Sequence, residues 1–318
     1  MATISKKMTR AMKAREWKRD FRTNKALYLF LLPGLVFLIM FCYIPMAGLV
    51  IVFKNYNFRD GIFGSPWAGF DNFEFFFYSF EKAARATFNT IFLNINFIIF
   101  GTIFAVFTAI VINEVRGNVF KKSVQSSIFL PYFLSWTVLG GILMTILDYR
   151  TGTFNSLIGS LGMSPIDFYK EAEYWPAILT ISNIWKGIGY NSIVYIAVIT
   201  GFDPSYYEAA VVDGATRMQR IFRITLPMLK PTIVMLTLLS VGRIFFGDLT
   251  MILGLTKGSP LLLPTTETID LFVYRSAMQS GQFSYASAVA LYQSICGFII
   301  VIAANFFAGR FDKDYKIF

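Results

Sequence analysis

The sequence predicts an all-α integral membrane protein, and two observations favour this fold class: its apolar composition and its long apolar runs. Of the 318 residues, 55% are hydrophobic and only 15% are charged, and the mean hydropathy is +0.56. Apolar runs of roughly 20 or more residues, about the length of a helix that crosses ~30 Å of hydrocarbon, occur six times. The chain has no histidine, which excludes histidine-ligated metal sites and histidine-dependent catalytic triads. An ordinary soluble domain is therefore not expected.

Each of the six apolar runs is interpreted as one transmembrane helix. The first follows a basic stretch, but it is much longer than the core of a signal peptide and no small-residue cleavage site follows it, so we interpret it as a retained span. Prolines inside the runs are compatible with spans, because neighbouring helices can satisfy the freed backbone groups. The six predicted spans lie near residues 27–53, 86–112, 126–147, 176–200, 231–255 and 285–308.

The distribution of Lys and Arg predicts the orientation in the membrane. Six spans place both termini on one side, and the segments on that side carry 19 of the 29 basic residues, whereas the opposite loops carry 8. Because basic residues concentrate in cytoplasmic loops, both termini are predicted to be cytoplasmic. The net charge of +10 is therefore explained by topology in a lipid bilayer, and no nucleic-acid partner is expected.

This topology divides the chain into three parts. Residues 1–26 are a basic cytoplasmic segment, residues 27–308 are the six-span membrane domain, and residues 309–318 are a cytoplasmic tail. The first segment mixes apolar side chains with many cations. It could lie as an amphipathic helix on the anionic inner leaflet or remain a disordered basic tail, and both interpretations stay open.

The longest predicted cytoplasmic loop, residues 201–231, carries start and stop signals for two helices. Asp203 is typical of an N-cap, Pro204 of a first helical residue, and Gly214 of the left-handed residue that ends a helix.

A second helix is predicted directly after this turn. Thr216 and Gln219 have the spacing of a capping box, and Pro227 and Pro231 are expected to end the helix. One face is expected to pack on the membrane domain and another to meet lipid phosphates or a partner protein. The first face comprises Met218, Ile221, Phe222 and Thr225, and the second comprises Arg217, Arg220 and Arg223. Without further information, a solvated amphipathic connector is an alternative interpretation.

The same loop resembles the EAA loop of binding-protein-dependent ABC importer permeases. The matching positions, in the same order and spacing, are Glu208-Ala209-Ala210, Asp213-Gly214-Ala215, Phe222, Ile224, Leu226-Pro227 and Pro231. The segments WKGIGYNSIVYIAVITGFDPSYYEAA, YLFLLPGLVFLIMFCYIPM, GSPWAGFDNFEFFF and ETIDLFVYRSAMQSGQFSYASAVALYQS resemble the carbohydrate-uptake branch of that family, which includes the maltose and oligosaccharide permeases. The likeness runs from about residue 27 to residue 307.

The resemblance implies a type I ABC importer permease fold whose loop is a coupling helix seated in a cleft of a cytoplasmic ATPase. Glu208 would contact the ATPase, Ala209 and Ala210 would allow close packing, and Gly214 would make the turn. The implied coupling residues are Glu208, Ala209, Ala210, Asp213, Gly214, Ala215, Leu226 and Pro227.

The resemblance also implies partners and a location. They are a second permease subunit, which is expected to be a distinct paralogue, two ATPase subunits and an extracellular solute-binding lipoprotein, all at a bacterial cytoplasmic (inner) membrane. The chain has no GxxxxGK[ST] phosphate loop, so it is not expected to be an enzyme, and ATP with Mg is expected on the ATPase chain. No cofactor or metal is expected on this chain itself.

Polar residues inside predicted spans are candidates for the substrate path, because exposing them to lipid is costly. Sugars are commonly held by hydrogen bonds beneath an apolar ring face, which suits such a set. Interhelical hydrogen bonding or snorkelling to the membrane surface is the alternative for each residue. The candidates are Asn183, Trp185, Lys186, Tyr190, Asn191, Arg243, Asp248, Tyr292 and Gln293.

An ion-coupled secondary sugar transporter is the main alternative function. It would need an acid near the bilayer midplane and often shows internal repeats. Asp248 is the one acidic candidate in a predicted span, and no repeat is visible. A membrane-embedded enzyme is a weaker alternative, since the usual histidines are absent.

Overall fold

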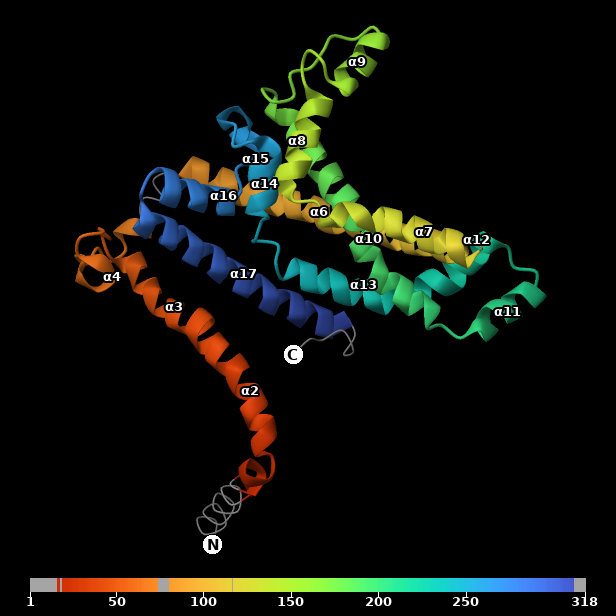
Figure 1. Cartoon of the computed structure of the whole chain (residues 1–318), viewed down its shortest axis with the longest axis horizontal. Helices are drawn as coiled ribbons and strands as arrows, with labels where there is room; N and C mark the ends of the chain where they lie inside the picture. Colours follow the sequence, from red (N-terminus) through yellow and green to blue (C-terminus); the bar gives the residue numbers. More distant parts are fainter. Residues whose placement is uncertain (1–15, 18, 74–79, 116, 312–318) are drawn as a thin grey trace. The chain divides into compact units, whose positions relative to one another are not determined.

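The computed structural model describes residues 16–17, 19–73, 80–115 and 117–311 (Figure 1). Most of the predicted segment 1–26 and most of the tail 309–318 therefore lie outside the described residues. Within those residues the secondary structure is helical except for one antiparallel bridge between Lys54 and Trp67. Residues up to Gly69 form one compact unit, and residues from Phe70 onward form another.

The first unit is built on a helical run of 29 residues, Lys25–Phe53. Large apolar side chains are exposed at successive positions along it, as expected for a helix that is apolar on every side and faces lipid. The run comprises α2 (Lys25–Leu38), a π-helical turn (Ile39–Tyr43), α3 (Ile44–Met46) and a 3-10 segment (Ala47–Phe53), and α4 (Gly61–Gly64) follows it.

The second unit is centred on two long helices that pack side by side, α6 (Phe80–Glu114) and α10 (Trp175–Thr200). Small residues of α6, among them Ala105 and Ala109, are buried against Tyr195 and Ile199 of α10. The remaining helices are α7 (Asn118–Phe129), α8 (Trp136–Leu147), α9 (Thr153–Ser160), α11 (Pro204–Val212), α12 (Arg217–Arg220), α13 (Leu226–Val241), α14 (Leu249–Thr256), α15 (Leu263–Thr266), α16 (Ile269–Tyr274) and α17 (Phe283–Phe311).

Two glycines let helices of this unit approach closely. A Cβ atom on Gly140 of α8 would lie 1.8 Å from the carbonyl oxygen of Gly254 of α14. A Cβ atom on Gly189 of α10 would lie 2.4 Å from the carbonyl oxygen of Ile128 of α7. Small residues at crossings are typical of helix packing in membranes.

Four described helical runs are long and apolar enough to cross a membrane: Lys25–Phe53, Glu81–Glu114, Arg217–Val241 and Phe283–Phe307. Val119–Phe133 and Trp136–Leu147 would make a fifth, but they meet at an angle of 98°. Helix α10 coincides with the predicted span 176–200 and is long enough, yet its polar side chains keep it outside this set. The count of six spans therefore stays a prediction.

The predicted span 231–255 is not a continuous helix in the structure. Helix α13 ends at Val241, and α14 begins at Leu249. The break is held by tertiary hydrogen bonds, since the Asp270 carboxylate accepts a hydrogen bond from the backbone N–H of Gly247 at 2.6 Å. Arg243 and Asp248 thus lie in the break between two helices.

The expectation that Pro227 and Pro231 end the second loop helix is wrong. The helical run continues from Arg217 to Val241 through a π-helical turn, Ile221–Thr225. Pro227 and Pro231 both lie within this continuous run, and the π-helical turn directly precedes α13, in which both prolines lie.

Candidate functional site

The first helix of the loop 201–231 begins and ends where the sequence predicts. The Asp203 side chain caps α11 by accepting a hydrogen bond from the backbone N–H of Ser205 at 2.9 Å. That hydrogen bond lowers the pKa of Asp203 below its usual range. At the other end Gly214 has a φ of +77°. The N–H of Ala215 donates to the carbonyl of Ala210 at 2.8 Å, which completes a Schellman motif.

The predicted capping box of the second helix is also confirmed. The backbone N–H of Gln219 donates to the Thr216 hydroxyl at 3.3 Å, and the backbone N–H of Thr216 donates to the Gln219 side-chain oxygen at 2.7 Å. Two capped helices joined by one left-handed glycine therefore form a compact, well-defined turn.

The outer surface of this turn is unusually apolar. Val212 is 87% exposed, and Met218 and Phe222 are 65% and 63% exposed. Glu208 and Ala209 are exposed as well, and Glu208 has no hydrogen bond or ion pair with any residue in the described part of the chain. An exposed carboxylate beside small and apolar side chains is suited to contact with another protein.

The structure buries only part of the face of the second helix that was expected to pack on the membrane domain. Thr225 is buried and lies 3.0 Å from the Tyr207 hydroxyl, in agreement with the expectation. Met218 and Phe222 are instead exposed, and Ile221 is partly buried, so the buried face runs through Ile221 and Thr225. Of the predicted basic face, Arg217 and Arg223 are exposed and Arg220 is partly buried.

A second cluster forms where α10 meets the bend between α7 and α8. The Lys186 ammonium donates to the carbonyl oxygen of Tyr132 at 2.8 Å and lies 5.0 Å from the ring centroids of both Tyr132 and Trp136. The Tyr190 ring stacks on the Tyr132 ring at 4.4 Å and 6°. Cation–π contacts of this kind stabilise a charge away from water.

Asp248 joins the same cluster from the break before α14. One of its carboxylate oxygens accepts a hydrogen bond from Trp136 Nε1 at 2.7 Å. The other caps α14, because it accepts from the N–H of Met251 at 2.9 Å and from the Thr250 hydroxyl at 2.6 Å. The side-chain amide of Asn183 donates a hydrogen bond to the sulfur of Met251, in the same helix α14, at 3.7 Å. The structure therefore brings Lys186, Tyr190, Asp248 and Asn183 to one region.

Three of the candidates line a separate cavity of about 460 Å³ between α6, α10 and α13. Tyr190, Asn191 and Arg243 supply polar groups to it, as do Thr102, Tyr195 and Ser240, and apolar side chains such as Phe97 and Leu236 supply most of the remainder. Tyr190 thus connects the aromatic cluster with this cavity.

The other candidates lie elsewhere. Gln293 is buried and donates to the carbonyl oxygen of Phe245 at 2.6 Å and to the Asp270 carboxylate at 3.1 Å, so it holds the break after α13. Trp185 is exposed, and Tyr292 is partly buried in α17.

Sequence reasoning missed Tyr132, Trp136 and Asp270. The first two were counted as apolar members of a predicted span, although Pro131 and the N-capping Ser135 mark a break beside them. The third falls in a segment predicted to be external, so its hydrogen bond to Gly247 in a predicted span was invisible.

Comparison with known proteins identifies the family. The family described as binding-protein-dependent transport system inner membrane component matches residues 98–315. Protein LplB of Bacillus subtilis (strain 168) is 34% identical over 318 residues, which cover 99% of both chains. The polygalacturonan/rhamnogalacturonan transport system permease protein YteP of the same organism is 34% identical over 300 residues, which cover 92% of this chain and 90% of that protein.

A solved structure agrees. A chain of a bacterial ABC transporter involved in the import of the acidic polysaccharide alginate has a TM-score of 0.84 and 35% identity, over 94% of this chain and 99% of that one. The same kind of transporter in complex with an alginate pentasaccharide-bound periplasmic protein gives a TM-score of 0.83. The predicted all-helical permease fold is thereby confirmed, and the chain belongs to the family of binding-protein-dependent transport system inner membrane components.

Proposed function

We propose that the chain is a permease subunit of an ATP-driven importer that carries a carbohydrate, specifically an oligosaccharide, across the cytoplasmic membrane. The names of its relatives support a sugar cargo, since YteP is a polygalacturonan/rhamnogalacturonan permease and the solved neighbour imports alginate. The substrate is delivered by an extracellular solute-binding protein, as the complex of the alginate transporter with a periplasmic protein suggests.

The observation that carries this proposal is the exposed, doubly capped turn formed by α11 and α12. It acts as the coupling element and docks into a cleft of a cytoplasmic ATPase subunit, where Glu208 makes a polar contact. Ala209, Ala210 and Ala215 permit close approach, and Asp213 and Gly214 shape the turn. Leu226 and Pro227 connect this element to α13, so movement of the docked turn is passed directly to a membrane helix.

Assembly follows from the same proposal. This chain forms one half of the pathway and pairs with a second, distinct permease subunit, and two ATPase subunits bind ATP and Mg. Both termini are cytoplasmic. ATP binding draws the two docked turns together and shifts the membrane helices between inward-facing and outward-facing states, and substrate biases these states only through its different affinity for them.

The substrate path is assigned to the aromatic cluster and the cavity beside it. Tyr132, Trp136 and Tyr190 offer ring faces for sugar, and Lys186 and Asp248 offer a charged donor and acceptor. Asn191 and Arg243 extend the polar lining into the neighbouring cavity.

Reversing the charge of Glu208 tests the coupling. With the complete complex in proteoliposomes, Glu208→Lys is expected to lower ATP-driven uptake and substrate-stimulated ATP hydrolysis at least about tenfold, because a lysine cannot accept the charged hydrogen bond proposed for the carboxylate, whose loss costs more than about 1.4 kcal/mol. Glu173→Lys, at another exposed glutamate outside the loop, is the matched control and is expected to leave both rates unchanged.

Uptake that continues without the ATPase subunits would contradict the proposal and favour an ion-coupled transporter. Asp248 is the one acid in a predicted span, and in the structure both of its carboxylate oxygens already accept hydrogen bonds, from Trp136, Thr250 and Met251, so its side chain caps α14.

A further inference from the structure

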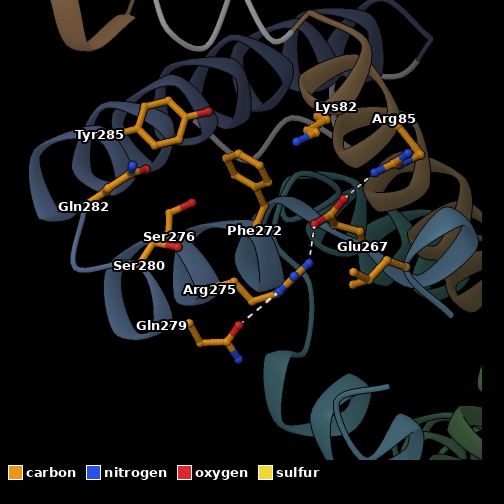
Figure 2. A pocket seen from close by; sticks show the side chains of 11 residues that line it. Lys82, Arg85, Glu267, Phe272, Arg275, Ser276, Gln279, Ser280, Gln282 and Tyr285 are labelled. Carbon is orange, nitrogen blue, oxygen red and sulfur yellow. Dashed lines mark hydrogen bonds and ion pairs between the residues drawn. The ribbon is translucent and has the colours of Figure 1, made fainter. Parts of the chain in front are cut away.

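A cavity of about 360 Å³ lies between the start of α6 and the region where α16 leads into α17 (Figure 2). Its lining residues fall in two loops on the predicted external side, one between the predicted spans 27–53 and 86–112 and the other between 231–255 and 285–308, except for Tyr285, the first residue of the last predicted span. The volume is within the range of about 300–1,000 Å³ that is typical of small-molecule sites. None of the candidate substrate residues lines it.

Three cations and one carboxylate give this cavity a net charge of +2. The Glu267 side chain is only 5% exposed, and it is paired with Arg85 at 2.8 Å and with Arg275 at 2.9 Å. Figure 2 shows the two arginines reaching Glu267 from different helical segments. One arginine is enough to neutralise a buried carboxylate, so the pair of arginines keeps a net positive charge, and their side chains, 35% and 34% exposed, remain accessible to an anion.

Two donors of this cavity lack partners within the described residues. The Nε atom of Arg85 is buried and makes no hydrogen bond there. Lys82 lies one helical turn before it on the exposed side and has no ion pair in the described part of the chain. A buried donor is normally satisfied, so the Nε atom of Arg85 indicates a missing acceptor, and the exposed Lys82 ammonium adds a second positive charge near it.

The remaining lining is suited to a sugar ring. The rings of Phe272 and Tyr285 pack edge to face at 5.7 Å. Around them lie the amides of Gln279 and Gln282 and the hydroxyls of Ser276 and Ser280. An aromatic surface with amide and hydroxyl groups can bind the apolar face and the hydroxyls of a pyranose, and the cations can bind an anionic substituent.

We propose that this cavity is an external binding subsite for one anionic sugar unit of the transported carbohydrate. The substituent, a carboxylate or a phosphate, binds to Lys82, Arg85 and Arg275, while the ring lies against Phe272 and Tyr285. This inference rests on the proposed function for the direction of transport, but binding itself requires neither ATP nor the delivery protein. The cavity thus selects charged over neutral sugars before they enter the membrane.

Ligand binding tests this proposal directly. The full chain is placed in nanodiscs of neutral lipid and titrated with galacturonate, galactose 6-phosphate and galactose, which share one ring and differ at C6, and binding is followed by saturation-transfer NMR. We expect one or both anionic sugars to bind at least about tenfold more tightly than galactose, with an affinity that falls as salt is added. The stronger of the two identifies the substituent.

Variants locate the site. Lys82→Gln removes an exposed cation that pairs with no described residue, and it is expected to weaken the anionic sugar about three- to tenfold without changing galactose binding. Gln282→Glu, at an exposed position, is expected to weaken binding of the anionic sugar as well, because it adds a negative charge beside the cations. Lys170→Gln, at an exposed lysine outside the cavity, is the matched control and is expected to have no effect.

Equal affinity for the three sugars would overturn the proposal. So would a preference for anionic sugars that persists unchanged in both Lys82→Gln and Gln282→Glu. If the complete complex transported no carbohydrate while the binding differences remained, the proposed transport function would be contradicted. The proposed binding site would still be supported.

Discussion

Gly214 is the residue on which the shape of the proposed coupling turn, formed by α11 and α12, depends most directly. Its φ of +77° is strained for any residue with a Cβ atom, yet no atom would contact such a Cβ within 4 Å. Gly214→Ala is therefore expected to destabilise the turn by about 1–2 kcal/mol through backbone strain alone. Faster hydrogen exchange of the amides of α11, measured by mass spectrometry, would report it.

The control for Gly214 is Gly159→Ala in α9, where there is equal space and no positive φ. This variant is expected to leave exchange in α11 unchanged. Protection of α11 that is the same in Gly214→Ala as in the unaltered protein would refute the strain argument.

Trp136 combines two roles that can be separated by substitution. Its Nε1 donates to Asp248, and its ring lies under the Lys186 ammonium. Trp136→Phe keeps a ring for the cation and removes the donor, so we expect a loss of about 1 kcal/mol in the free energy of unfolding, measured by thermal melting in detergent. Trp185→Phe, at an exposed tryptophan without a hydrogen bond to described residues, should melt as the unaltered protein does.

At the scale of helices, the sequence predicted the helix ends that depend on neighbouring residues. It did not predict the helix breaks that depend on contacts with distant residues. Asp203, Gly214 and the Thr216 capping box are short-range patterns, and the structure confirms all three. The end of α13 at Val241 instead depends on hydrogen bonds from Gly247 and Gln293 to Asp270, which lies more than 20 residues away from either. The sequence remains largely apolar across this break, so its hydropathy predicted a single span over residues 231–255.

Two adjacent glycines of α8, Gly140 and Gly141, allow the close crossing of α8 and α14 to be tested with a matched control. Gly140→Ala would place a Cβ atom 1.8 Å from the carbonyl oxygen of Gly254, so the helices must separate. We expect a loss of about 1–3 kcal/mol in the free energy of unfolding, visible as a lower melting temperature. Gly141→Ala meets no atom within 4 Å and should be neutral or stabilising, because alanine favours helix by about 1 kcal/mol over glycine.

At the scale of the whole molecule, the EAA pattern and its surroundings were sufficient to predict the family, whereas the spatial arrangement of the candidate polar residues was only partly predictable. The resemblance identified a permease, and the family match over residues 98–315 confirms it. Lys186, Tyr190 and Asp248 do meet in space, but through Tyr132 and Trp136 from a bent segment that sequence periodicity treats as one span. Proximity across a bend is a tertiary property, which single-sequence patterns do not encode.

Orientation in the membrane is the whole-molecule prediction that one labelling experiment can decide. In a background with both cysteines, Cys42 and Cys296, replaced by alanine, Arg150→Cys and Arg223→Cys place a thiol at two exposed arginines on predicted opposite sides. With 19 basic residues on one side against 8 on the other, Arg223 is expected to be cytoplasmic. A membrane-impermeant maleimide should therefore label the thiol at 150 in intact cells, and the thiol at 223 only after permeabilisation. The reverse pattern would invert the topology and move the coupling turn away from any cytoplasmic ATPase, so this result would remove the physical basis of the proposed coupling as well.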